Sequence, residues 1–214
     1  MTEYCKIPNI YVRDAYFTRK IVEGEYTSEV LEQLAGITWV WTEKVDGTNI
    51  RVFWDGHRVT FGGRTDKAQI PAELVNYLQE KFGSVETEEI FEQLFGEKEV
   101  ILFGEGFGGK IQAAGPKYGE TRFVLFDVMV NGKYLDRENV YTIGTQFQVE
   151  IVPAVGIGTL PEAVEFVKMH KQSHFGDIEM EGIVCRPVFE LMDGNGKRII
   201  VKIKARDFPK EADA

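Results

Sequence analysis

Short runs of β-branched and aromatic residues, separated by turn sequences such as Asp-Gly, recur along this 214-residue chain. Runs of about four to eight such residues between turn signals are typical of β-strands and too short for most helices. The first three runs predict a strand meander at 38–43, 49–54 and 58–61. Later apolar runs predict buried strands at 100–104 and 123–130, and two further strands are predicted at 182–187 and 198–203.

Three segments instead have a pattern typical of helices. Pro71 is the first residue of one that extends to about Phe82, residues 86–95 form a second, and Pro161 is the first residue of a third that extends to His170. Helices do not alternate regularly with strands, so a doubly wound α/β fold is not expected. The sequence predicts an α+β fold around antiparallel sheet, as one domain over residues 1–214.

The composition indicates a globular chain and favours a reducing compartment. Hydrophobic residues make up 43%, enough to form a core without a disulfide or a structural metal. The two cysteines, Cys5 and Cys185, form neither a disulfide framework nor a zinc motif, which favours a reducing, cytoplasmic setting. Apolar runs stay well below the roughly 18 residues of a membrane span, and the N-terminus lacks a signal-peptide pattern. We expect no membrane partner.

The net charge of −9 argues at first against a nucleic-acid partner. Residues 71–99 account for most of it, since eight glutamates stand there against two lysines, and the rest of the chain carries only −3. Residues 197–206 contain five lysines and arginines and no acidic residue. An acidic helical face can coexist with a basic site, so net charge does not exclude nucleic acid.

Two short patterns indicate chemistry that their surroundings do not support. Residues 104–110 have the spacing of a phosphate-binding loop, but Ile111 replaces the hydroxyl that binds Mg²⁺, and Gly115-Pro116 interrupts the required helix. His170 and His174 have the spacing of helical metal ligands without the H-E-x-x-H pattern. We expect neither a Walker-type site nor a metal site at these positions.

Lys44 is the best candidate for covalent chemistry, in the sequence Lys-Val-Asp-Gly-Thr-Asn that follows a predicted strand. A lysine amine attacks an electrophilic phosphorus only after losing its proton, which burial or neighbouring cations favour. Lys202 and Lys204 alternate on one predicted strand and therefore face the same side, where they would bind phosphates. Taken alone, Lys44 is also consistent with an exposed lysine beside an Asp-Gly turn.

Residues 44–49 resemble motif I of the covalent nucleotidyltransferases, which include ATP-dependent DNA ligases, RNA ligases and mRNA capping enzymes. Segments similar to motifs III, IIIa, IV and V follow in the same order at 103–105, 124–127, 181–184 and 201–204. Asn49 stands where DNA ligases and capping enzymes usually carry arginine, which favours the RNA ligase 2-like branch. The resemblance implies a nucleotidyltransferase (ATP-grasp-like ligase) fold, with antiparallel sheets and flanking helices around an ATP cleft.

The resemblance also implies a role for each matching position. The nucleotide would be bound by Lys44 as the nucleophile that forms lysyl-AMP, Glu105 at the ribose, Phe126 against the adenine and Glu43 at the adenine edge. The negative charge of the phosphates would be neutralised by Arg64, Lys202 and Lys204. A divalent metal (Mg²⁺ or Mn²⁺) would be bound by Glu181 and Asp46. The 5′-phosphorylated strand would be contacted by Asn49 and Arg51.

The implied activity is ATP-dependent RNA ligation through lysyl-AMP and AMP–RNA, with RNA ends or a nicked duplex as substrate and RNA repair as the setting. The alternatives are a DNA nick ligase, a guanylyltransferase and a non-catalytic nucleotide- or RNA-binding module. Ligases usually continue beyond motif V into an OB-fold or helical domain, whereas ten residues follow Lys204. We therefore expect one adenylyltransferase domain without that appended domain, and a helper protein that supplies it.

Overall fold

A computed structural model describes residues 2–14, 16 and 18–210 of the chain. The chain divides into two compact units, each made of two separate segments. Unit 1 contains Met1–Cys5 and Asp46–Val152, and unit 2 contains Lys6–Val45 and Pro153–Ala214. The predicted domain over residues 1–214 stays a prediction, and each unit is described here by itself.

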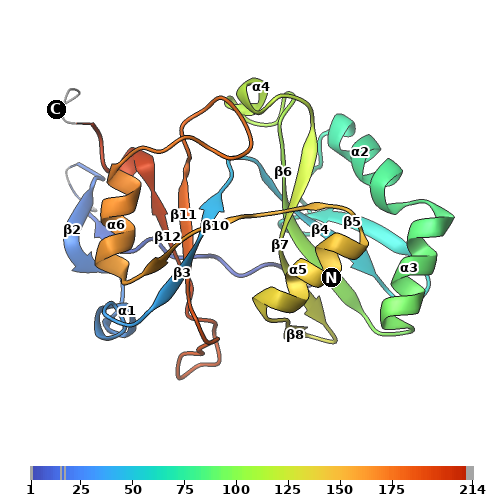
Figure 1. Cartoon of the computed structure of the whole chain (residues 1–214), viewed down its shortest axis with the longest axis horizontal. Helices are drawn as coiled ribbons and strands as arrows, with labels where there is room; N and C mark the ends of the chain where they lie inside the picture. The colour runs from blue at the N-terminus through green and yellow to red at the C-terminus, as the bar shows by residue number, and fades with distance from the viewer. Residues whose placement is uncertain (1, 15, 17, 211–214) are drawn as a thin grey trace. The chain divides into compact units, whose positions relative to one another are not determined.

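Unit 1 is built on a six-stranded sheet (Figure 1). Five of its strands follow the order β5–β4–β6–β7–β8, and the sixth, β9, pairs with β7. All of its strand pairs are antiparallel except β7–β9. The strands are β4 (Thr48–Trp54), β5 (Val59–Gly63), β6 (Val100–Phe107), β7 (Arg122–Val130), β8 (Lys133–Tyr134) and β9 (Glu150–Ile151).

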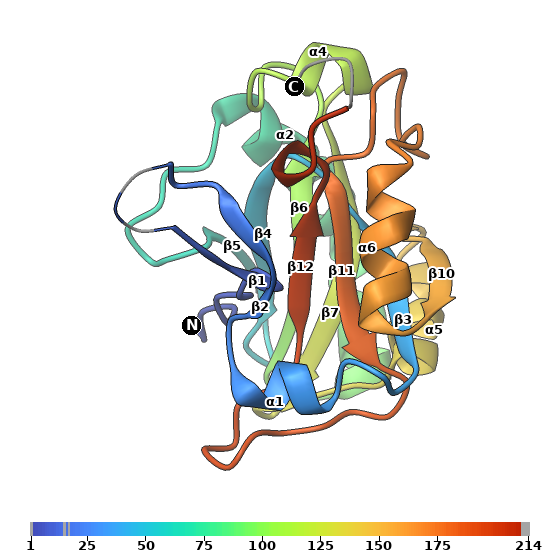
Figure 2. The same cartoon turned by 90° about the vertical axis from the view of Figure 1, so that its left-hand side faces the viewer.

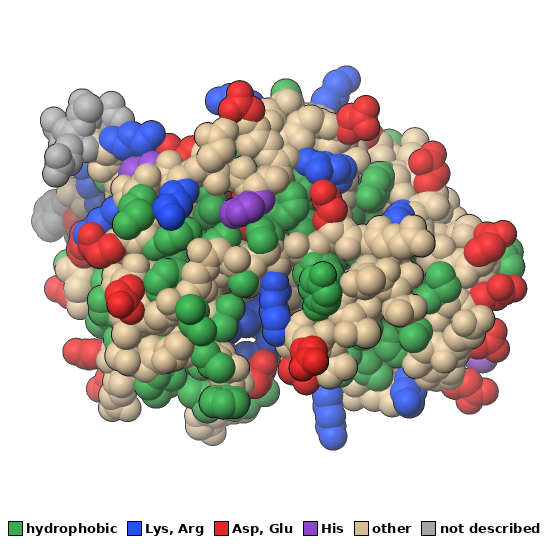
Figure 3. Space-filling view, in the orientation of Figure 1, with side chains coloured by type: hydrophobic (Ala, Val, Ile, Leu, Met, Phe, Trp, Pro, Cys, Tyr) green, Lys and Arg blue, Asp and Glu red, His purple; other side chains and the backbone are tan. Residues whose placement is uncertain are grey.

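The core of unit 1 lies on one face of this sheet, beneath helices. Alternate strand residues such as Ile50, Leu102 and Leu125 point to that face and pack against Leu78 and Phe91 of the helices. The helices of unit 1 are α2 (Ala72–Phe82), α3 (Val85–Phe95), α4 (Gly115–Tyr118) and α5 (Arg137–Gln146). Acidic side chains gather over α3, at the right-hand edge of Figure 3, in agreement with the charge of residues 71–99.

Unit 2 is built on a four-stranded antiparallel sheet with the order β10–β3–β11–β12 (Figure 2). The hairpin of β1 and β2 forms a separate two-stranded sheet. Residues just before β1 run beside the free edge of β12, where Ile10 and Lys202 donate backbone hydrogen bonds. The strands are β1 (Tyr11–Arg13), β2 (Ile21–Tyr26), β3 (Trp39–Lys44), β10 (Ala154–Gly158), β11 (Gly182–Pro187) and β12 (Val201–Lys204).

The core of unit 2 also lies on one face of its sheet. Trp39, Ile183 and Ile203 point to that face and pack against Leu160 and Val164. Leu160 and Val164 belong to the helix α6 (Leu160–Lys168), which lies in front of the sheet in Figure 2. The remaining elements of unit 2 are α1 (Glu29–Gln33) and a 3₁₀ turn at Ala205–Asp207.

The predicted α+β fold with antiparallel sheets is confirmed, but the predicted meander is wrong. Strand β3 pairs with β10 and β11 in unit 2, and only β4 and β5 form a hairpin. Short strand patterns carry no information on which distant strand will pair with them, so the pairing of β3 was invisible locally. The sequence analysis also missed the β1–β2 hairpin and α5, although Asp136 caps α5 by accepting from the Asn139 backbone N–H.

Smaller differences concern the ends of elements. Pro71 is the N-cap of α2 and not its first residue, and α6 begins at Leu160, one residue before Pro161. Strand β6 continues to Phe107, so Gly104, the first glycine of the phosphate-loop pattern, is a strand residue, and Gly109 lies in the turn that follows the strand. None of the helices in the described part of the chain is long and apolar enough to cross a membrane.

Candidate functional site

Three predicted site residues meet at one end of the unit 2 sheet. The Nζ of Lys44 lies 2.6 Å from Oε2 of Glu181, and the Nζ of Lys204 lies 2.6 Å from Oε1 of the same carboxylate. The three side chains are 22%, 15% and 15% exposed, so they are reachable but largely shielded from water. A carboxylate that joins two ammonium groups in this way sets the spacing of two positive charges.

Strand register explains why the two lysines meet. Gly182 is the Cα partner of Lys44 on one side and of Lys204 on the other. Gly182 has a φ of +152°, and a Cβ there would lie 2.1 Å from the carbonyl oxygen of Ile203. Only glycine fits this position, which fixes Glu181 immediately before it between the two lysines.

The same face of the unit 2 sheet carries further positive charge. Lys202 and Lys204 alternate with Val201 and Ile203, which belong to the core on the opposite face. Lys202 is the Cα partner of Val184, and two residues further along β11 the same period places Arg186 on this face. The sequence analysis missed Arg186, although its spacing from Gly182 along the predicted strand was a sufficient signal.

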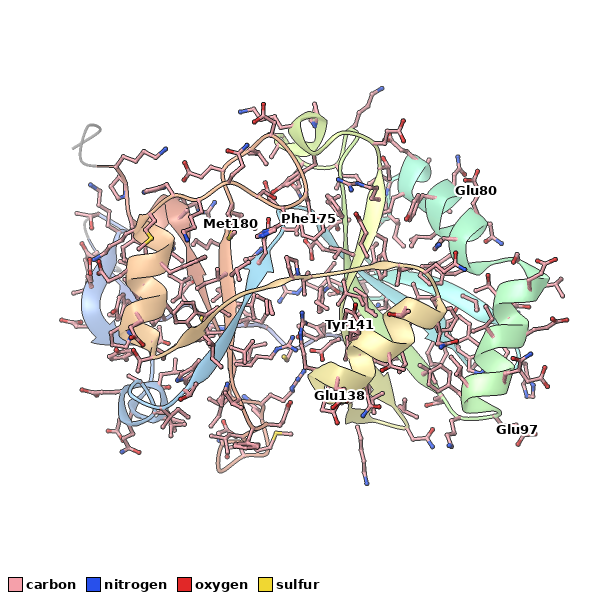
Figure 4. The ribbon with its side chains drawn as sticks, viewed as in Figure 1. Glu80, Glu97, Glu138, Tyr141, Phe175 and Met180 are labelled. Carbon is pink, nitrogen blue, oxygen red and sulfur yellow. The ribbon has the colours of Figure 1, made fainter. Side chains whose placement is uncertain are left out.

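Glu43, the residue before Lys44, is buried and already engaged. Its carboxylate accepts hydrogen bonds from the Ser173 hydroxyl and from the backbone N–H of His174 at 3.0 Å, and it lies 2.8 Å from Nδ1 of His174. Phe175 and Met180, which are labelled in Figure 4, are buried in the same segment between α6 and β11. Glu43 therefore ties this segment to β3 next to Lys44, and no sequence signal indicated it.

In unit 1 the backbone after Lys44 makes a close turn at Gly47. A Cβ at Gly47 would lie 2.2 Å from the carbonyl oxygen of Gly106, so the turn requires glycine. Gln112 donates to the Gly47 carbonyl at 3.1 Å, and the Asp46 backbone N–H donates to the Tyr118 hydroxyl at 3.4 Å. These contacts hold the Asp46–Gly47 backbone, and Asp46 is half-buried.

Asn49, Glu105 and Phe126 lie on the face of the unit 1 sheet opposite its core, which we call the site face of unit 1. Asn49 is the Cα partner of Glu105 in the β4–β6 ladder. Phe126 is the extra residue of a β-bulge, since the register with β6 passes from Asp127 to Leu125. A bulge redirects a side chain, and it leaves Phe126 partly exposed in an otherwise buried strand.

The two predicted arginines of unit 1 differ in environment. The Arg51 guanidinium is fully buried, donates to the Gly63 carbonyl at 2.7 Å and pairs with Asp66 at 2.9 Å. That hydrogen bond holds the pKa of Asp66 below its usual value. The RNA contact expected of Arg51 stays a prediction, and its burial argues for a structural role. Arg64, just after β5, is exposed.

His170 and His174 each contact a glutamate carboxylate. His170 contacts Glu179, which also pairs with Lys210 at 2.8 Å. Partial burial raises the pKa of Glu179, but the hydrogen bonds from Lys210 and His170 outweigh it, so the pKa lies below its usual value. Among the described residues, no group of three or more His, Cys, Asp or Glu side chains is placed to hold a metal ion.

Each unit therefore offers one part of what nucleotide chemistry needs. The unit 2 face presents a lysine amine beside a carboxylate and further cations, which suits attack on a phosphate. The site face of unit 1 presents a carboxylate for hydroxyl groups and an aromatic ring for a base.

Comparison with solved structures gives the fold independent support. A ligand-free variant of the Naegleria gruberi RNA ligase shares 20% identity with the chain at a TM-score of 0.62, covering 86% of this chain and 54% of that one. A variant of the same enzyme with ATP and Mn shares 19% identity at a TM-score of 0.63, covering 84% of this chain and 53% of that one. The enzyme with PPi shares 18% identity at a TM-score of 0.63, covering 96% of this chain and 62% of that one. At these low identities, the TM-scores show a shared fold and nothing further.

The chain spans between half and two thirds of the length of these solved relatives. The family model described as RNA ligase matches residues 37–204, which is well over half of the chain and includes every segment that resembles a nucleotidyltransferase motif. The chain therefore belongs to the RNA ligase family.

Proposed function

We propose that this protein is an ATP-dependent RNA ligase that forms a covalent AMP adduct on Lys44. The observation that carries the proposal is the pairing of Lys44 and Lys204 with one Glu181 carboxylate, on a sheet face that also bears Lys202 and Arg186. Side chains packed only for stability would not place a half-buried amine among further cations.

The proposed reaction is three in-line transfers. Deprotonated Nζ of Lys44 attacks the α-phosphorus of ATP, a P–N bond forms, and the α–β bridging P–O bond breaks to release pyrophosphate. An oxygen of an RNA 5′-phosphate then attacks the same phosphorus and displaces the lysine, which gives AMP–RNA. An RNA 3′-OH finally attacks the 5′-phosphate, so that a phosphodiester forms and AMP leaves.

The remaining residues would bind and orient these groups. Lys204, Lys202 and Arg64 would neutralise negative charge as it develops on the leaving phosphates. Glu105 would accept hydrogen bonds from the ribose hydroxyls, and the bulged Phe126 would stack on the adenine, a contact of roughly 1–3 kcal/mol. For the adenine-edge role proposed for Glu43, the contacts of its carboxylate with Ser173 and His174 would have to be exchanged.

A divalent metal fits the donors present. Mg²⁺ and Mn²⁺ favour oxygen ligands, and Glu181 and Asp46 each offer a half-buried carboxylate. Bound by such a carboxylate, the metal would supply positive charge to the phosphates. The solved N. gruberi relatives with ATP or AMP contain Mn, which supports the same requirement here.

RNA ends are the proposed substrate, in a cytoplasmic RNA-repair setting, with a nicked duplex as one form and a helper protein as a partner. Comparing nicks that end in a ribose or a deoxyribose 3′-OH distinguishes this from a DNA nick ligase. Labelling by GTP in place of ATP would indicate a guanylyltransferase.

The decisive experiment is intact-protein mass spectrometry after incubation with ATP and Mg²⁺ or Mn²⁺. The protein is first stripped with pyrophosphate, because AMP acquired during expression would hide the reaction. We expect a gain of one AMP, absent in Lys44→Ala, present in the exposed-lysine control Lys98→Ala, and reversed by pyrophosphate. Binding of ATP without any adduct under either metal would instead establish a nucleotide-binding module.

A further inference from the structure

Unit 2 contains a cavity of about 550 Å³ that lies on the α6 side of its sheet. Its lining combines the rings of Tyr11, Trp41 and Phe166 with the exposed side chain of Met169. Trp41 belongs to the core face of β3, and Lys44 lies at an odd spacing from it, on the opposite face of the same strand. The cavity is therefore separate from the Lys44 cluster, and its volume is within the range of about 300–1,000 Å³ typical of ligand pockets.

Trp41 lines this cavity and has a buried indole N–H without a hydrogen-bond partner among the described residues. The other two tryptophans both donate to carbonyl oxygens at 2.9 Å, Trp39 to Leu34 and Trp54 to Gly96. Of the three tryptophans, Trp41 alone lines the cavity, so its indole N–H signal can report binding there.

The rim of the cavity is acidic. Glu23, Glu162 and Glu165 all line it, and acidic side chains are visible over α6 on the left of Figure 3. Lys168 pairs with Glu23 at 2.6 Å and with Glu165 at 2.9 Å, while Glu162 accepts from Thr159 at the N-cap of α6. Each carboxylate can accept about four hydrogen bonds, so Glu23 and Glu165 can still accept hydrogen bonds from a ligand while both pair with Lys168.

This combination selects one class of occupant. Aromatic and aliphatic walls favour an apolar side chain, and the acidic rim favours cations and repels the phosphates of RNA. A cation near these rings is already tolerated, since Lys171 Nζ lies 4.6 Å from the centroid of Phe166. We propose that this cavity binds a peptide segment of a partner protein in which an apolar residue is flanked by lysine or arginine.

The test is an NMR titration of the full-length ¹⁵N-labelled protein with the blocked peptide acetyl-Gly-Lys-Leu-Arg-Gly-amide. We expect the indole N–H signal of Trp41 to shift and saturate with a Kd of about 1 mM or tighter. The indole signals of Trp39 and Trp54 serve as internal controls and should stay in place, because neither ring lines the cavity and both donors already have acceptors.

Charge variants test the role of the rim. Glu23→Gln with Glu165→Gln should raise the Kd about three- to tenfold, as expected for two partly exposed ion contacts. Lys168→Gln should lower it, because a competing cation is removed. The control pair Glu80→Gln with Glu97→Gln, two exposed glutamates of unit 1 labelled in Figure 4, should leave it unchanged.

The proposal is overturned if the Trp41 signal does not move at 5 mM peptide, a concentration about five times the expected Kd. It is equally overturned if acetyl-Gly-Glu-Leu-Glu-Gly-amide shifts the signal as strongly, or if a single-stranded RNA does so. The test does not depend on ligase activity, so Lys44→Ala should bind the peptide like the unchanged protein.

Discussion

At the residue scale, the Glu181 carboxylate is the contact on which the proposed chemistry most depends, because one side chain orients two lysines. Glu181→Gln keeps the size of the side chain and removes its charge. We expect the rate of AMP-adduct formation to fall about 10- to 100-fold, measured by single-turnover intact mass spectrometry. Glu179→Gln is the matched control, since Glu179 pairs with His170 and Lys210. Equal rates for both variants would contradict the role of Glu181.

The two cysteines should differ in reactivity for a reason that also belongs to single residues. Burial raises the pKa of the Cys185 thiol far above its usual value, whereas Cys5 is exposed. The thiolate is the reactive form, so at pH 8 iodoacetamide should modify Cys5 and leave Cys185 unmodified. Mass spectrometry should show one adduct on the folded protein and two in denaturant. Two adducts under native conditions would show that β11 opens readily.

At the element scale, α6 depends on its N-terminal capping box. Thr159 accepts from the Glu162 backbone N–H, and the Glu162 carboxylate accepts from the Thr159 backbone N–H at 2.7 Å. Thr159→Ala should lower the free energy of unfolding by about 1 kcal/mol, which corresponds to roughly 2–4 °C in Tm. Thr159→Ser keeps the capping hydroxyl and should retain most of this stabilisation. A Tm unchanged in the alanine variant would show that α6 is held by packing alone.

The same capping box predicts a dependence on pH. The hydrogen bond from the Thr159 backbone lowers the pKa of Glu162 below its unfolded value of 4.5. The stabilisation is therefore present above that pH and is lost as the pH falls through the lower folded value. Thr159→Ala keeps that backbone donor but removes the Thr159 hydroxyl, the second donor that lowers this pKa, so the Tm difference between the unchanged protein and Thr159→Ala should narrow below about pH 4. A difference that stays constant from pH 7 to pH 3 would contradict this assignment.

At the scale of the whole molecule, the chain passes between its units three times, so the first five residues belong with the segment that starts at Asp46. Tyr4 ties them to unit 1: its ring lies 5.0 Å from those of both Phe103 and Phe126, and its hydroxyl donates to buried Asp127 at 2.7 Å. Tyr4→Ala should lower the free energy of unfolding by about 3–5 kcal/mol in a urea titration.

Tyr4→Phe separates the two contributions, because it retains the ring contacts and removes the hydrogen bond. We expect a loss of about 1–3 kcal/mol for this variant. A loss in Tyr4→Ala no larger than that in Tyr4→Phe would show that the ring contacts contribute nothing, and that the N-terminal segment is held by the hydroxyl alone.

The local patterns were sufficient for most individual strands and helices, and the residues of the motifs identified the family. Alternation places Lys202 and Lys204 on one face of a strand whatever the strand pairs with, because the side-chain period of two is local. The asymmetric charge of residues 71–99 likewise follows from composition alone and appears as the acidic surface of α3.

Only the tertiary structure decided which strands pair and which polar groups find partners. Lys44 and Glu181 are 137 residues apart, and they meet because Gly182 lies in register between two lysine-bearing strands. Local patterns do not encode such long-range register, which is why β3 was assigned to the wrong sheet and why the engagement of Glu43 was unexpected. The unpartnered indole of Trp41 has the same origin, since an N–H lacks an acceptor only by virtue of what the fold places around it.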